Sequence, residues 1–154
     1  MRPPLLLLLP ALALSGCAHA LVVEAAPHAS DPDCARVMLA APPTLGGLPA
    51  RGTTSQATEA WGEEFPIVVR CGVEIPSPTT DHCVGVLVNS YAVDWVITER
   101  KDEWVATTYG RRPAVEAIIP KARADQALGD LLAELTPAAS LAPLTGRSCV
   151  GPGD

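Results

Sequence analysis

Apolar residues recur at two different spacings along the chain, and each spacing predicts one kind of element. Near the N-terminus the spacing is helical, because Cys34, Val37, Met38 and Ala41 fall on one side of residues 31–41. An aspartate followed by a proline begins this segment, as in the first turn of many helices, and two prolines end it. We therefore predict an N-terminal helix whose inner side includes a cysteine.

The middle of the chain consists of short apolar runs separated by turn residues, which is the pattern of strands. The loop at residues 74–81 contains two prolines, and Arg100-Lys101-Asp102 is predicted to form a charged hairpin tip. Residues 44–64 are rich in glycine, threonine and serine, and we predict a mostly irregular segment there. The predicted strands are residues 66–72, 84–88, 92–99, 103–109 and 114–119.

A second helical stripe follows the last predicted strand and ends at Thr136-Pro137. Its members are Ala124, Leu128, Leu131, Leu132 and Leu135. A helix, then strands in meander order, then a second helix predict the α+β class. The expected architecture is an antiparallel sheet of four or five strands, with an N-terminal and a C-terminal helix packed on one face.

The first residues have the pattern of a leader for export. The apolar run at residues 5–14 is shorter than the roughly 20 residues that a transmembrane helix needs. Leu14-Ser15-Gly16-Cys17 follows it and matches a lipobox, in which small residues precede a cysteine whose thiolate is alkylated by a diacylglyceryl donor. We predict a lipoprotein signal peptide at 1–16, a lipid-anchored tether at 17–30 and a single disulfide-stapled α+β domain at 31–154.

Ordinary secretion is the alternative interpretation, because Ala18-His19-Ala20 matches the cleavage pattern of the general signal peptidase. Cleavage there would discard Cys17 and release the protein. Both interpretations place the domain outside the cytoplasm, and the lipobox favours the extracytoplasmic face of the cell membrane. The two acyl chains of a diacylglyceryl group would hold the protein there stably.

Acidic residues outnumber basic ones by 17 to 11, so the chain has a formal net charge of −6. The lack of a basic stripe argues against nucleic acid as a partner and against electrostatic docking to anionic lipid. The expected partners are the membrane, through a covalent lipid on Cys17, and an envelope protein or cell-wall fragment. No cofactor is predicted.

Four cysteines remain beyond Cys17, and an even number in an oxidising compartment predicts two disulfides. Asp81-His82-Cys83 contains ligand side chains, but the cysteines are scattered singly without a C-x-x-C pair, so no metal site is predicted.

Four cysteines allow three pairings, and the predicted elements favour one of them. Cys71 ends one predicted strand and Cys83 begins the next, so we expect these two sulfurs to lie on neighbouring strands and to pair. Cys34 on the first helix and Cys149 in the C-terminal tail form the second predicted disulfide.

Common catalytic motifs are missing from the sequence, which has no G-x-S-x-G elbow, no Gly-rich phosphate loop and no H-E-x-x-H. His82 with Asp81 or Asp94 would be the base of a small secreted hydrolase or transferase, and this alternative stays open. We favour a non-catalytic protein, because the sequence shows no set of nucleophile, base and orienting group.

Three residues are candidates for a binding surface. Trp61 lies in the segment predicted to be irregular, where an aromatic side chain is available for binding, although filling the core is the common use of tryptophan. Arg70 and Arg111 would together clamp an anionic group such as a carboxylate. The alternative is that these arginines form structural pairs with Glu74 or Glu116.

Several short motifs together resemble one protein family. They are Cys34 in the first helix, Trp61-Gly62, the run Ile67-Val68-Val69-Arg70-Cys71-Gly72, Cys83, Val93-Asp94-Trp95, Gly110-Arg111-Arg112-Pro113 and Pro120. The series resembles the domain-of-unknown-function 3515 family, small exported proteins and lipoproteins of actinobacteria, over about Cys34 to Leu135. The resemblance implies an exported location and no assigned activity. We therefore expect a non-catalytic, lipid-anchored envelope protein that acts as a binding or accessory module.

Overall fold

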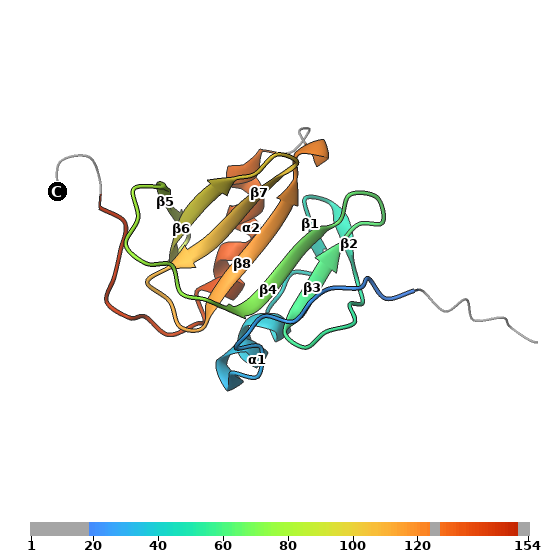
Figure 1. Cartoon of the computed structure of the whole chain (residues 1–154), viewed down its shortest axis with the longest axis horizontal. Coiled ribbons are helices and arrows are strands. Elements are labelled where there is room, and N and C mark those ends of the chain that lie inside the picture. Colours follow the sequence, from blue (N-terminus) through green and yellow to red (C-terminus); the bar gives the residue numbers. More distant parts are fainter. Residues whose placement is uncertain (1–18, 124–126, 151–154) are drawn as a thin grey trace, which may run out of the picture.

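The computed structural model describes residues 19–123 and 127–150. The predicted signal peptide and the predicted lipidation site Cys17 lie outside these residues. Within them the chain forms two α-helices, eight strands and one short 3-10 helix (Figure 1). In chain order the elements are α1 (Pro32–Leu39), β1 (Thr44–Leu45), β2 (Leu48–Arg51), β3 (Thr58–Trp61), β4 (Ile67–Val73), β5 (His82–Val88), β6 (Tyr91–Glu99), β7 (Glu103–Tyr109), β8 (Ala114–Pro120), η1 (Lys121–Arg123) and α2 (Leu128–Ala139).

All eight strands belong to one antiparallel sheet in the order β1-β2-β3-β4-β8-β7-β6-β5. The predicted α+β class and antiparallel sheet are confirmed, but the predicted number of four or five strands is wrong. The three additional strands come from residues 44–61, which were predicted to be irregular. They have two to four residues each, too few for a period-two pattern to appear in the sequence.

The meander order is also wrong, because β4 and β5 are consecutive in the chain but not adjacent in the sheet. β4 pairs with β8, and β5 pairs only with β6 at the far edge. Three strands therefore lie between β4 and β5, and the two axes are about 19 Å apart at about 4.8 Å per strand. Residues 74–81 carry the chain from one to the other.

This strand order explains why the predicted disulfide pairing is wrong. Bridged cysteines need Cα atoms within about 7 Å, which Cys71 on β4 and Cys83 on β5 do not meet. The observed disulfides are Cys34–Cys71 and Cys83–Cys149, with Cα–Cα distances of 5.6 and 5.7 Å. All four cysteines are bridged as expected, but the first disulfide joins α1 to the sheet, and the second fixes the C-terminal tail to β5.

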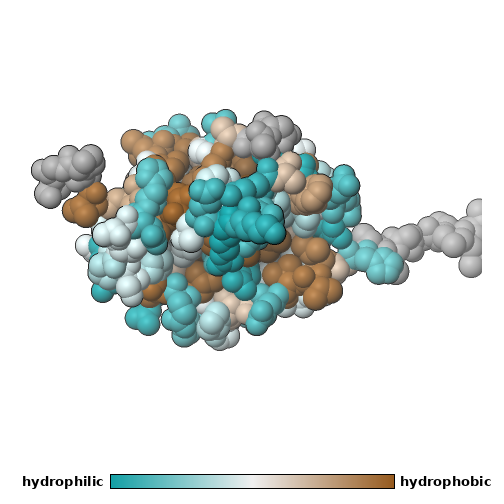
Figure 2. Space-filling model, turned by 45° about the horizontal axis from the view of Figure 1, so that its top comes forward, coloured by the Kyte–Doolittle hydropathy of each residue, from teal (hydrophilic) through white to brown (hydrophobic). Residues whose placement is uncertain are grey.

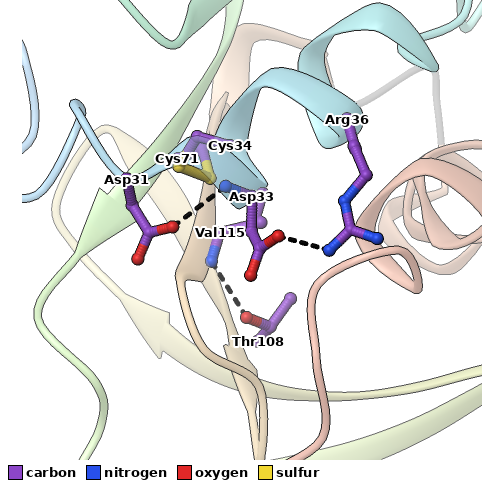
Figure 3. The surroundings of a disulfide bond; sticks show 7 residues. All are labelled: Asp31, Asp33, Cys34, Arg36, Cys71, Thr108 and Val115. Atoms are coloured by element: carbon purple, nitrogen blue, oxygen red, sulfur yellow. Dashed lines mark hydrogen bonds and ion pairs between the residues drawn. A yellow bond between two sulfur atoms is a disulfide. The ribbon is translucent and has the colours of Figure 1, made fainter.

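The N-terminal helix forms where its sequence pattern places it. The side chain of Asp31 caps α1 by accepting a hydrogen bond of 2.9 Å from the backbone nitrogen of Asp33. Cys34 and Val37 are buried, which confirms the predicted inner side of the helix. Figure 3 shows the Cys34–Cys71 disulfide just beyond this cap, between α1 and the sheet.

The C-terminal helix buries Leu131, Leu132 and Leu135, as its stripe predicts, whereas Ala124 lies outside the described residues. The helix continues past Pro137 to Ala139, two residues beyond the predicted end. Pro137 has no N–H to bond to the carbonyl four residues earlier, but only two helical residues follow it, so the distortion that a proline causes affects little of the helix.

One hydrophobic core holds both helices against the sheet. It includes buried residues of α1 and α2 together with inward-facing residues of β3, β4, β6 and β8. Trp61 and Trp95 are fully buried at its centre. Each indole nitrogen donates a hydrogen bond, from Trp61 to the carbonyl of Pro42 at 2.9 Å and from Trp95 to the Thr136 hydroxyl at 3.4 Å. Figure 1 shows α2 behind the sheet, and no helix of the described residues covers the opposite face.

The predicted tether at 17–30 is corrected by the structure, because residues 21–30 belong to the folded domain. The backbone nitrogen of Leu21 donates to the carbonyl of Gly52, and that of His28 donates to the carbonyl of Gly72, both at 2.8 Å. Two alanines of this segment are buried against the ends of β4 and β8. Backbone pairing and small apolar side chains allow it to pack without the periodicity of a helix or strand.

Candidate functional site

The three residues predicted to form a binding surface have structural roles. Trp61 has no exposed surface. Arg70 on β4 donates to one carboxylate oxygen of Glu116 on β8 at 2.9 and 2.6 Å, and it also reaches the carbonyl of Glu24 at 3.4 Å. This is the structural pair with Glu116 that the sequence offered as the alternative. The prediction of Trp61 and Arg70 as binding residues is therefore wrong.

Arg111 is buried and holds the chain after α2 against the sheet. Its guanidinium donates to the carbonyls of Ser140, Ala142 and Ala92 at 2.6 to 2.7 Å. Burial lowers the pKa of Arg111, and the nearby carboxylate of Asp94 opposes that shift. Because all these donors point at backbone carbonyls, Arg111 is not available to clamp a ligand, and its prediction as a binding residue is also wrong.

A hollow of about 450 Å³ opens where the N-terminal segment, the start of α1, the end of β4 and the start of β8 meet. We call it the Arg112 groove. Its lining residues are Pro27, His28, Ser30, Asp31, Pro32, Val73, Glu74, Ile75, Arg112, Pro113 and Ala114.

Close backbone packing builds the walls of this groove. Gly72 has a φ of +89°, and a Cβ at this position would lie 2.3 Å from the carbonyl carbon and oxygen of His28. Only glycine therefore allows the N-terminal segment to lie against β4. Ala114 and Val73 pack with Ala26 and Ala29 of that segment in a small apolar cluster beneath the groove.

Charged groups of both signs face the groove. Arg112 is exposed, and its guanidinium has no hydrogen-bond or ion-pair partner among the residues that the structure describes. One carboxylate oxygen of Asp31 is used by the helix cap, and Glu74 lies 3.3 Å from His28 Nε2. A free guanidinium beside carboxylates suits a polar ligand that presents a carboxylate or phosphate to the arginine.

The sequence contains a signal for Arg112 that the interpretation missed. Arg111 and Arg112 are adjacent in the connection between the predicted strands 103–109 and 114–119, and charged side chains are seldom buried, so at least one of the two was expected to face outwards. The sequence does not say which of the two, because that depends on where the tail after α2 lies.

A second hollow, of about 340 Å³, contains His82 and Asp81 together with the Cys83–Cys149 disulfide. Asp94 is not part of its lining, and its carboxylate accepts a hydrogen bond of 2.7 Å from the backbone nitrogen of Cys149. Within residues 19–123 and 127–150, no hydrogen bond joins the His82 side chain to a carboxylate or a hydroxyl. The structure thus places His82 and Asp81 at one hollow without assembling a catalytic set.

Other surfaces of the described chain offer less to a ligand. In the face that Figure 2 presents, hydrophilic residues gather over the middle and hydrophobic residues lie around them, so no broad apolar patch dominates. The described histidines, cysteines and acidic residues include no group of three placed to hold a metal ion. None of the helices in the described ranges is long and apolar enough to cross a membrane.

These features define a class of protein: a small α+β domain with a sheet covered by helices on one face, closed by two disulfides and carrying an open polar groove. The disulfides indicate an oxidising, extracytoplasmic environment. The chain belongs to the family described as protein of unknown function (DUF3515), whose model matches residues 12–142. No curated protein and no solved structure matches the chain.

Proposed function

We propose that this protein is a non-catalytic binding module, anchored by a lipid on Cys17 to the extracytoplasmic face of the cell membrane. The observation that carries the binding role is the Arg112 groove, an open site with an unpaired guanidinium among the described residues. The lipobox at residues 14–17 supports the anchor. A secreted form, cut after Ala20, is the alternative location.

The size and charges of the groove define the kind of ligand. Its volume lies within the roughly 300–1,000 Å³ that is usual for small-molecule sites. Arg112 selects an anionic group with two oxygens, while Glu74 and Asp31 favour ammonium or hydroxyl groups elsewhere on the ligand. A cell-wall fragment that carries a free carboxylate has this chemistry, and so does the C-terminus of an envelope protein.

Disulfide stapling supports a rigid site. Cys34 in α1 is bridged to Cys71 in β4, and both elements contribute to the groove. Because these walls are already held in place, binding requires little ordering of the chain, which favours affinity in a small domain.

The test is binding of soluble, carboxylate-bearing cell-wall fragments to the mature protein in detergent, measured by calorimetry. Arg112→Ala should lower the affinity by about 10- to 100-fold, because a hydrogen bond to a charged group contributes about 1.5–3 kcal/mol. Arg100→Ala is the matched control, since Arg100 lies in the β6–β7 turn and pairs there with Glu103. Equal affinities of the two variants, or no binding of any fragment, would contradict the proposal.

The hollow that contains His82 and Asp81 supports a second candidate function, an enzyme. An extracytoplasmic hydrolase or transferase would use His82 as its base at this position. Turnover of ester and amide substrates by the mature protein, abolished in His82→Ala without a change in thermal stability, would support the enzyme and overturn the non-catalytic proposal.

A further inference from the structure

The N-terminal end of the described chain is fixed to the domain by one arginine. Nη2 of Arg51 on β2 donates to the carbonyl of His19 at 3.0 Å, and Leu21 pairs with the backbone of Gly52 directly afterwards. Only Ala18 separates His19 from Cys17. Two residue steps span at most about 7 Å, so a lipid on Cys17 brings this part of the domain to the membrane surface.

The same arginine joins the N-terminal end to the turn between β3 and β4. Nη1 of Arg51 lies 3.4 Å from the carbonyl of Gly62 and 3.0 Å from a carboxylate oxygen of Glu63. Figure 1 shows the N-terminal segment leaving the domain on the side of this turn. We call His19, Arg51 and the turn at residues 62–66 the anchor edge.

Phe65 is the aromatic residue of the anchor edge and the single phenylalanine of the chain. It is 55% exposed, and its φ of +50° is unusual for a bulky side chain. Nε of Arg123 donates to its carbonyl at 3.0 Å, and the same guanidinium donates to the carbonyl of Glu64. The backbone is therefore held in a strained conformation that presents an apolar ring to the surroundings, as at many functional sites.

The charges of the anchor edge are nearly balanced, although the whole chain is acidic. Arg51 pairs with Glu63, and Arg123 lies against the turn beside Glu64. A balanced edge approaches zwitterionic lipid without strong repulsion. At such a surface the exposed carboxylates of Glu63 and Glu64 would stay at headgroup depth, while the ring of Phe65 would reach the boundary with the acyl chains.

We infer that the anchor edge lies on the membrane and that Phe65 inserts into the lipid interface. This inference rests on the proposed lipid anchor, and it adds a second contact to the covalent one. Helix α1, which carries one wall of the Arg112 groove, lies away from the β3–β4 turn in Figure 1, so the groove stays open to the extracytoplasmic space.

The test uses the mature lipidated protein, which begins at Cys17, in phosphatidylcholine vesicles whose acyl chains carry bromine, which quenches nearby tryptophan. Phe65→Trp should lose emission in these vesicles relative to unbrominated ones. Leu39→Trp is the matched control, because Leu39 is 89% exposed on α1 and should keep its emission. Of the three native tryptophans, Trp61 and Trp95 are fully buried and Trp104 is half-buried. All three are present in both variants, so they add the same background to each.

The outcomes separate the two levels of the proposal. If both variants float with the vesicles but show equal quenching, the lipid anchor stands and the contact of Phe65 with the membrane is overturned. If neither variant floats with the vesicles, the lipid anchor itself is overturned, and this inference with it.

Discussion

Arg111→Ala is the change that best separates structural from binding arginines. The substitution removes a buried guanidinium and leaves three backbone carbonyls, those of Ala92, Ser140 and Ala142, without their donor. Two of these carbonyls belong to the chain after α2 and the third to the start of β6. The loss therefore detaches the C-terminal segment from the sheet.

The magnitude follows from the number and kind of these bonds. A hydrogen bond to a charged group contributes about 1.5–3 kcal/mol, and an unsatisfied buried carbonyl costs about as much. Contributions within one cluster are not additive, so we expect a total loss of about 4 kcal/mol. Such a loss is a large part of the roughly 5–15 kcal/mol by which a domain is stable. Arg111→Lys should lose most of it as well, because one ammonium cannot reproduce the planar donor geometry.

Guanidinium-induced unfolding, followed by circular dichroism, measures the effect. Arg112→Ala is the control, because the Arg112 side chain is exposed and has no partner among the described residues. This substitution should change the free energy of unfolding by less than about 0.5 kcal/mol. Equal destabilisation by the two substitutions, or a loss below about 1 kcal/mol for Arg111→Ala, would refute the assignment of the buried role to Arg111.

Three further predictions address the fold. Replacing both cysteines of the buried Cys34–Cys71 disulfide by alanine should lower the free energy of unfolding by about 4 kcal/mol, because the disulfide closes a loop with a sequence separation of 37. The cavity left by the two sulfur atoms adds to this loss. The thermal midpoint should therefore fall further than after loss of the half-exposed Cys83–Cys149 disulfide. Burial raises the pKa of Glu59 from its ordinary value of 4.5, so the native state binds the proton more tightly and loses stability as pH rises above that value. Glu59→Gln should therefore stabilise the protein at pH 7 and have no effect below about pH 4 in pH-dependent unfolding. Gly72→Ala should displace the N-terminal segment, and limited proteolysis should then cleave residues 21–30 faster than in the unchanged protein.

Elements with a sustained period were predictable from the sequence. The bounds of β4, β6, β7 and β8 lie within two residues of those predicted, and the inner side of α1 is correct, because six or more residues carry each pattern. Strands β1 to β3 are shorter, and pairing with neighbours defines them rather than their own residues. Their β-structure is a tertiary property, which local sequence does not encode.

The sequence did not predict which distant segments of the chain lie side by side. The predicted disulfide pairing was wrong because β4 and β5 are neighbours in the chain but not in the sheet. The prediction of Trp61 and Arg111 as binding residues was wrong for a related reason. Their burial depends on segments distant in sequence, the loop after α1 for Trp61 and the chain after α2 for Arg111. A one-residue shift along the chain, from Arg111 to Arg112, separates a buried structural role from an open groove.

We expect Cys17 to hold this disulfide-closed domain at the extracytoplasmic face of the membrane through its lipid. Intact mass spectrometry of the protein extracted from membranes tests it most directly. We expect a chain that begins at Cys17, carries a diacylglyceryl group there and has its four other cysteines oxidised. A soluble mature chain that begins at Leu21 and carries no lipid would contradict it.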